Sequence, residues 1–125
     1  MALLVSGKVI KSFGAPKDAS RLSITVPSSY LSEAYGLITG DKILGKIIKV
    51  KANFDTSEIE GKPIELILKK GAVYDELFIS EKSWKENFRE YGLVEGGFEI
   101  ELKLEEATLY TGENIKLYSK RDVKV

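Results

Sequence analysis

The side chains of this chain restrict the chemistry that it could perform. Its 125 residues include no cysteine and no histidine. Thiol nucleophiles, imidazole general bases and cysteine–histidine zinc sites are therefore excluded, because each of them needs one of these two residues. An enzyme built on this chain would depend on carboxylate, Lys, Tyr or Ser side chains, together with a cofactor or nucleotide. Enzymatic activity stays open, but we favour a non-enzymatic role and expect no cofactor and no bound metal.

Basic side chains are concentrated in the first half of the chain. The whole chain is neutral, with 19 basic and 19 acidic residues. Residues 1–52 contain eight basic and three acidic residues, a net charge of +5, so residues 53–125 carry −5. The basic residues are Lys8, Lys11, Lys17, Arg21, Lys42, Lys46, Lys49 and Lys51. A basic region attracts phosphate over about 8–10 Å at physiological salt, although charges also segregate by chance along a short chain.

The first four of these basic residues lie before, or at the start of, an expected strand that is followed by a short helix. Residues 21–26 alternate polar and apolar side chains, which predicts a strand with one buried face. Pro27 ends the strand because it has no amide hydrogen for a ladder. Ser28 or Ser29 is then expected to cap a helix over Tyr30–Tyr35. Gly36 stands where the end of a helix favours a left-handed residue.

A similar order of residues recurs further along the chain, which indicates an internal duplication. A Tyr-Gly-Leu triplet occurs at 35–37 and again at 91–93, and each is followed at the same spacing by a glycine. We place the two repeats at about 7–52 and 61–106, with a C-terminal hairpin at 107–125, all within one domain of residues 1–125. Two such units that close on each other predict a mainly β fold with two short helices, as a pseudo-symmetric closed barrel of two swapped-hairpin-like repeats.

The second repeat is expected to contain the longer helix. Ser80 would cap a helix over Glu81–Tyr91, in which Trp84, Phe88 and Tyr91 form an apolar stripe typical of core packing. A strand over Glu99–Leu104 follows, with alternating apolar and charged residues.

The first repeat also carries a family resemblance. The pattern comprises Gly7-Lys8-Val9-Ile10-Lys11, then Arg21, Ser23-Ile24-Thr25-Val26-Pro27, Gly36-Leu37 and Gly40-Asp41-Lys42. In this pattern residues 7–47 resemble the SpoVT/AbrB-type swapped-hairpin domain, a looped-hinge DNA-binding module of the cradle-loop barrel superfamily. The second repeat matches only through its helix, Gly92-Leu93 and Gly96.

The resemblance implies a transcriptional regulator that contacts DNA through the basic first hairpin. Carried over by position, it points to Lys8, Lys11, Lys17 and Arg21 as the DNA-binding residues. Basic arms bind phosphate by releasing counterions, and an arginine can also bind guanine with two hydrogen bonds. The chain departs from the family in its acidic helix residue Glu33 and its long loop at 13–20. The equivalent second hairpin, Val73–Glu76, is acidic and is expected to be a poor phosphate site.

Two alternatives remain open. The duplicated chain is also similar to the archaeal CTP-dependent riboflavin kinases, which share the barrel. Their Gly-Thr-Leu-Asn-type motif corresponds here to Gly45–Lys49, which has no Thr or Asn, and no phosphate-binding loop of the Walker type is present. Asn53 and Asp55 could bind Mg²⁺ as oxygen ligands, but this pair alone is a weak signal. The third hypothesis is an antitoxin-like module that docks a protein partner.

The remaining expectations concern the setting of the protein. No apolar run approaches the length of a membrane span, and the first five residues are too short for a signal sequence. We therefore expect a cytoplasmic protein with no membrane partner. The absence of cysteine and the Lys/Glu/Ile-rich composition are typical of a thermophile or archaeon. Duplication favours a monomer, with a homodimer as the alternative.

Overall fold

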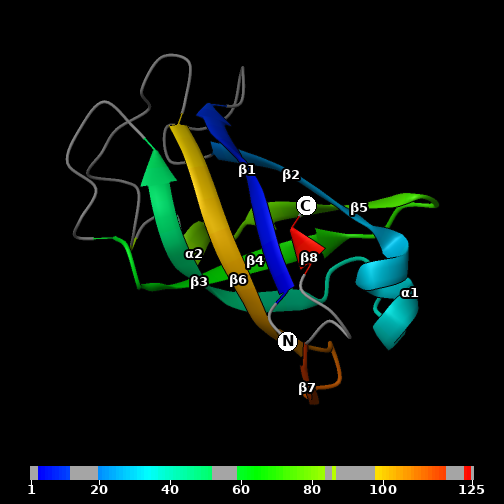
Figure 1. Ribbon diagram of the computed structural model, residues 1–125. Helices are drawn as coiled ribbons and strands as arrows, with labels where there is room; N and C mark the ends of the chain where they lie inside the picture. Colours follow the sequence, from blue (N-terminus) through cyan, green and yellow to red (C-terminus); the bar gives the residue numbers. More distant parts are fainter. Residues whose placement is uncertain are drawn as a thin grey trace.

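The structure is a computed structural model that describes residues 3–11, 20–51, 59–83, 86, 98–117 and 123–124. The strands are β1 (Leu3–Lys11), β2 (Ser20–Pro27), β3 (Lys42–Lys51), β4 (Pro63–Lys69), β5 (Tyr74–Ile79), β6 (Phe98–Thr108), β7 (Asn114–Lys116) and β8 (Val123–Lys124). A 3-10 turn covers Ser28–Tyr30, and the helices are α1 (Ser32–Tyr35) and α2 (Glu81–Ser83) (Figure 1). The predicted stripe of Trp84, Phe88 and Tyr91 lies outside the described residues.

Six strands form a continuous ring of antiparallel neighbours. The order is β1–β2–β5–β4–β3–β6, and β6 pairs back with β1 from Leu3 opposite Leu104 to Val9 opposite Phe98. Exchanging β1–β3 with β4–β6 maps these pairings onto themselves: β1–β2 becomes β4–β5, and β3–β4 becomes β6–β1. The predicted mainly β barrel with short helices is thereby confirmed. Such a ring leaves no long unpaired strand edge.

Alternation along the strands fills the interior of this ring. Ile24 and Val26 of β2 are buried while Thr25 is exposed, as their spacing predicts. On β6 the buried apolar residues include Ile100, Leu102, Leu104 and Ala107. These side chains belong to one cluster with Leu3, Val5, Ile43, Ile47, Ile64, Leu66, Leu68 and Leu77, among others. Within the described part of the chain, no helix is long and apolar enough to cross a membrane.

The start of α1 is held by a residue from the other repeat. The prediction that Ser28 or Ser29 caps this helix is wrong, because Leu31 occupies the N-cap position and its side chain makes no capping hydrogen bond. Instead Asp75 Oδ2 accepts the amide hydrogen of Ser32 at 2.8 Å, and Oδ1 accepts the hydroxyl of Ser32 at 2.7 Å. Gly36 ends the helix with φ of 66°, the predicted left-handed conformation. Asp75 therefore ties α1 to the β4–β5 hairpin.

The predicted cap of the second helix is confirmed. The amide of Ser83 donates to Ser80 Oγ at 3.2 Å, and the amide of Glu65 donates to Ser83 Oγ at 2.6 Å. Ser80 and Ser83 are both buried. The described turn of α2 is thereby fastened to β4.

Two irregularities in the register shape β3. They lie between Leu44 and Gly45 and between Ile47 and Lys49, where β3 pairs with β6. Gly45 is buried, and a Cβ atom there would overlap the backbone carbonyl of Lys103. The close approach of the two strands at this point therefore requires glycine.

Candidate nucleic-acid interface

Three of the four DNA-binding residues predicted by resemblance lie on one two-stranded segment. In the register of β1 and β2, Lys8 is opposite Ser23 and Lys11 is opposite Ser20, while Arg21 is opposite Ile10. The backbone positions of the three basic residues are therefore close together at one end of the barrel. Lys17 lies outside the described residues.

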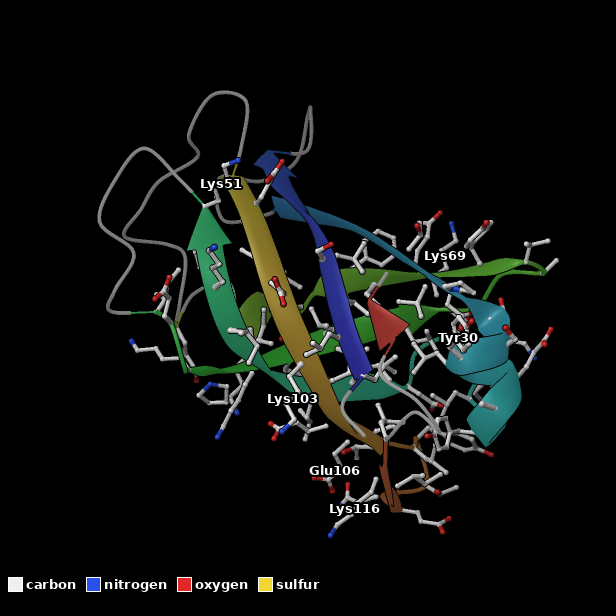
Figure 2. The ribbon with its side chains drawn as sticks, viewed as in Figure 1. Tyr30, Lys51, Lys69, Lys103, Glu106 and Lys116 are labelled. Atoms are coloured by element: carbon white, nitrogen blue, oxygen red, sulfur yellow. The ribbon has the colours of Figure 1, made fainter. Side chains whose placement is uncertain are left out.

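The end of β3 reaches the same part of the barrel. Glu99 of β6 is opposite Lys51 of β3 on one side and opposite Lys8 of β1 on the other. Since neighbouring strands are about 4.8 Å apart, the backbones of Lys8 and Lys51 are separated by roughly 10 Å. Figure 2 shows Lys51 at the tip of β3, beside the end of β1. Basic residues about forty positions apart in the sequence thus meet here.

Exposed lysines continue along the outer surface of β3. Lys46, Lys49 and Lys51 are all exposed on this strand. Lys46 is directly opposite Lys103 of β6, and Pro63, which follows the exposed Lys62, is its neighbour on β4. We call the set Lys46, Lys49, Lys51 and Lys103 the β3 lysine face. Like charges directly opposite each other in a sheet are destabilising, so the Lys46–Lys103 pair does not itself stabilise the sheet.

Carboxylates border this face on one side. Glu99 is opposite Lys51 and Glu101 is opposite Lys49, both on β6. Another neighbouring carboxylate, Glu60, accepts the amide hydrogen of Val50 at 3.3 Å. With Lys62, five lysines stand against these three glutamates and Glu105, which follows Lys103 on the outer side of β6, so the surface carries a small excess of positive charge.

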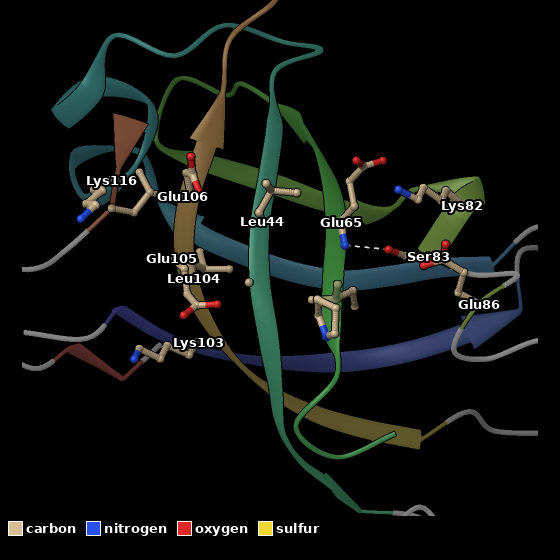
Figure 3. Close-up of a pocket in the computed structure, with 14 residues that line it drawn as sticks. Leu44, Glu65, Lys82, Ser83, Glu86, Lys103, Leu104, Glu105, Glu106 and Lys116 are labelled. Carbon is tan, nitrogen blue, oxygen red and sulfur yellow. Dashed lines mark hydrogen bonds between the residues drawn. The ribbon is translucent and has the colours of Figure 1, made fainter. Parts of the chain in front are cut away.

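A groove opens next to the lysine face, over β6, β3 and β4 (Figure 3). Its volume is about 810 Å³, within the usual range for ligand sites. Leu44 lies on its floor, with Glu106 and Glu65 opposite it on the two neighbouring strands. The remaining lining residues are Gly45, Pro63, Ile64, Lys82, Ser83, Glu86, Lys103, Leu104, Glu105, Lys116 and Leu117. An apolar floor with both signs of charge around it suits an amphipathic molecule, and Lys103 links it to the lysine face.

The surface of the β4–β5 hairpin is less acidic than its sequence predicts. Asp75 is fully buried and accepts hydrogen bonds from Ser32 and from the amide of Gly71 at 3.2 Å, so it is not on the surface. Lys69 and Lys70 are exposed around this turn, while Glu76 is half-buried. Figure 2 places Lys69 near α1, well away from Lys51.

Within the described residues, the segment considered for a nucleotide-binding enzyme does not form a phosphate-binding loop. Gly45–Lys49 lies within β3 and is paired with β6 through most of its length. Asn53 and Asp55 lie outside the described residues. Among the residues that are described, no group of three or more acidic side chains is arranged to hold a metal ion.

The sequence alone gave no indication of Lys103. Dividing the chain at residue 52 assigns this lysine to the acidic half, and only the pairing of β3 with β6 brings it beside Lys46. The outward positions of Lys42 and Lys46 could have been identified from their spacing, since Lys42, Leu44 and Lys46 alternate with buried Ile43, Gly45 and Ile47, whereas those of Lys49 and Lys51 depend on the bulge.

Comparison of the chain with protein-family models, with curated proteins and with solved structures finds no match in any of the three.

Proposed function

We propose that this protein binds DNA, as a regulator of the AbrB-like type, through the β3 lysine face and the adjoining end of the β1–β2 hairpin. The observation that supports this proposal most directly is the register of Lys46 opposite Lys103. The two lysines lie on neighbouring strands, so a phosphate bound at this place would be within reach of both side chains.

The dimensions of the surface also suit a nucleic-acid backbone. Lys46 and Lys51 are five residues apart on β3, which corresponds to about 16 Å of strand. Successive phosphates of one DNA strand rise by 3.4 Å and also rotate around the helix axis, so a straight strand of this length runs past about two or three of them. The positions of Lys8, Lys11 and Arg21 extend the surface beyond Lys51. Phosphate contacts of this kind provide affinity and orientation without reading sequence.

Removing two lysines from the face should weaken binding and reduce its salt dependence. We expect Lys46→Ala combined with Lys49→Ala to lower affinity for a mixed-sequence duplex by roughly thirtyfold at physiological salt, because each lost phosphate contact removes its share of counterion release. The slope of log affinity against log salt should fall by about two. Fluorescence anisotropy of a labelled duplex, titrated at several salt concentrations, measures both quantities.

The matched control is Lys69→Ala combined with Lys70→Ala. These two lysines are exposed on the β4–β5 hairpin. The control therefore makes the same change in net charge as the Lys46/Lys49 variant, at a site away from the β3 lysine face. The control should bind like the original protein. Equal losses in both double variants would show a general charge effect, and unchanged binding in the Lys46/Lys49 variant would rule out the face.

The hairpin residues are tested separately. We expect Lys11→Ala and Arg21→Ala each to weaken binding of the same duplex by about fivefold, the contribution of one phosphate contact at physiological salt. An undiminished affinity in Lys11→Ala would remove the first hairpin from the interface and leave the β3 lysine face as the proposed surface.

The alternatives make different predictions with the same protein. A riboflavin-kinase-like enzyme should bind a nucleotide in the presence of Mg²⁺, whereas a partner-docking module should bind neither nucleotide nor DNA. Titration of CTP with Mg²⁺ by calorimetry, next to the DNA titration, distinguishes the three. Binding of CTP without any binding of DNA would overturn our proposal.

A further inference from the structure

Most of the large apolar side chains that are exposed on this protein lie at one end of the barrel. Among the described residues they are Ile38 (46% exposed), Ile48 (45%), Val73 (68%), Tyr74 (56%) and Tyr110 (79%). The first precedes β3, the last follows β6, and the third and fourth lie where β5 begins. The start of β3 pairs with the end of β6, so these segments meet at the end of the barrel that carries α1 (Figure 1). We call Ile38, Val73, Tyr74 and Tyr110 the apolar end.

Hydrogen bonds join the loops that carry these side chains. The buried carboxylate of Asp41 accepts the amide hydrogen of Ile38 at 2.9 Å and that of Tyr110 at 3.2 Å. These two apolar residues are therefore neighbours, because one carboxylate binds both of their backbones. Thr39 Oγ1 accepts the amide hydrogen of Lys70 at 3.0 Å, which joins the loop before β3 to the β4–β5 turn. The apolar end thus stands on segments that are bonded to one another.

The composition of this surface is typical of a protein interface. Single apolar residues on a surface need no explanation, but several gathered in one place mark an interaction site. Tyrosine is enriched in interfaces because its ring buries a large area while its hydroxyl stays hydrated. Two further tyrosines, Tyr30 and Tyr35, are packed against the core at the same end, partly buried. Figure 2 shows Tyr30 at α1, close to Lys69.

The surrounding charges indicate which partner suits the apolar end. A surface that meets a copy of itself across a two-fold axis must not carry one strong sign of charge, since the same patch is present on both sides. The apolar end satisfies this condition, because exposed residues of both signs border it, namely Glu33, Glu113, Lys42, Lys69 and Lys70. The opposite end of the barrel carries the basic residues of the proposed DNA interface and would repel its own copy.

We propose that two copies of this chain associate through the apolar end, related by a two-fold axis, to form a homodimer. The inference does not depend on DNA binding. It leaves the β3 lysine face of each copy uncovered, because β3 carries ten residues from Lys42 at the apolar end to Lys51, a length of roughly 30 Å.

Sedimentation velocity over a wide range of protein concentrations tests this association. We expect the original protein to form dimers and no larger species, since a two-fold contact closes on itself. Val73→Ser combined with Tyr110→Ser should raise the dissociation constant of the dimer by about tenfold or more, because loss of a central aromatic residue is among the costliest changes in an interface. Both side chains are exposed in a single copy, so the monomer should fold as before.

Ile48→Ser is the matched control. It removes an apolar side chain of similar exposure from the far part of β3, outside the apolar end. The dissociation constant of the dimer should be unchanged in this variant. An equal loss in both variants would show a general effect of surface hydrophobicity and would overturn the inference.

Spin labels test the orientation of the two copies. The chain contains no cysteine, so one introduced cysteine carries one label in each copy. Distances between the labels of a dimer are measured by double electron–electron resonance. Labels attached to Ile38→Cys should lie closer together than labels attached to Lys51→Cys, because position 38 belongs to the proposed contact and position 51 to the opposite end.

Several results would overturn the inference. One is an original protein that stays monomeric at every concentration, and another is a dimer that the Val73/Tyr110 variant forms equally well. Labels that are closer at position 51 than at position 38 would assign the contact to the other end. A series of ever larger species would contradict the two-fold arrangement. None of these results bears on the salt-dependent binding of DNA, which is measured separately.

Discussion

Replacing Asp75 with alanine is expected to lower the free energy of unfolding by about 3–5 kcal/mol, because buried donors would lose their acceptor at a cost of about 1–3 kcal/mol each. The carboxylate is fully buried and accepts from Ser32 N, Ser32 Oγ and Gly71 N at 2.8, 2.7 and 3.2 Å. Ser28 Oγ lies 3.2 Å from Oδ1 as well. Domains of this kind have only about 5–15 kcal/mol in total, so a large share of the stability would be lost. Equilibrium urea unfolding measures it.

Two further variants identify the cause of this loss. Asp75→Asn keeps the volume and one acceptor oxygen but turns an amide group toward a donor, so we expect a smaller loss of about 1–2 kcal/mol. Glu33→Ala removes an exposed carboxylate on α1 and should change stability by no more than about 0.5 kcal/mol. A loss in Asp75→Ala no larger than that in Glu33→Ala would contradict the buried network.

Replacing Gly45 with alanine is expected to destabilise the barrel by about 2–4 kcal/mol, because overpacking forces backbone shifts. The added Cβ would overlap the carbonyl of Lys103, which belongs to the backbone and cannot rotate away. To accept the methyl group, β3 and β6 would have to separate at the irregularity beside Leu44. Urea unfolding measures the loss, and faster amide hydrogen exchange along β6 would locate it.

The neighbouring Leu44→Ala variant provides the contrast for this prediction. Leu44 is half-buried on the outer surface, so its truncation removes contacts without pushing the strands apart. Exchange protection along β6 should therefore survive in Leu44→Ala and decrease in Gly45→Ala. Unchanged stability of Gly45→Ala would show that the two strands are less close at this point than the structure indicates.

Local patterns predicted much of the fold. The alternation around Ile24 and Val26, the left-handed Gly36 and the cap at Ser80 each depend on residues within one turn or strand, and all three are found. Element ends were less well predicted. The first helix was expected over Tyr30–Tyr35, whereas α1 covers Ser32–Tyr35 and follows a 3-10 turn at Ser28–Tyr30.

The role of Asp75 could not be predicted from its neighbours in the sequence. Val73–Glu76 has the composition of an exposed acidic turn. The partners that make burial of Asp75 possible are Ser28 and Ser32, more than forty residues away. Only the pairing of β2 with β5 brings them together, so a local reading assigns the charge to the surface and the cap of α1 to the wrong side chain.

The candidate interface was also predicted only in part from the sequence. The resemblance gave Lys8, Lys11 and Arg21 by position, and the structure places their backbones on one hairpin. Lys46 was identified only as part of a basic half of the chain. Its relation to Lys103 depends on the register between β3 and β6, which local spacing does not determine.

The pairing of β1 with β6 has a consequence for how the protein is made. Translation adds about 5–20 residues per second, so roughly five to twenty seconds pass between synthesis of Val9 and synthesis of Leu104. Throughout that interval Leu3 and Val5, which are buried in the finished barrel, lack the strand beside which they pack. Contacts so distant in sequence also form slowly, because the intervening chain must first be ordered. The barrel therefore cannot close until β6 has been made, and until then the buried side chains of β1 need protection from aggregation.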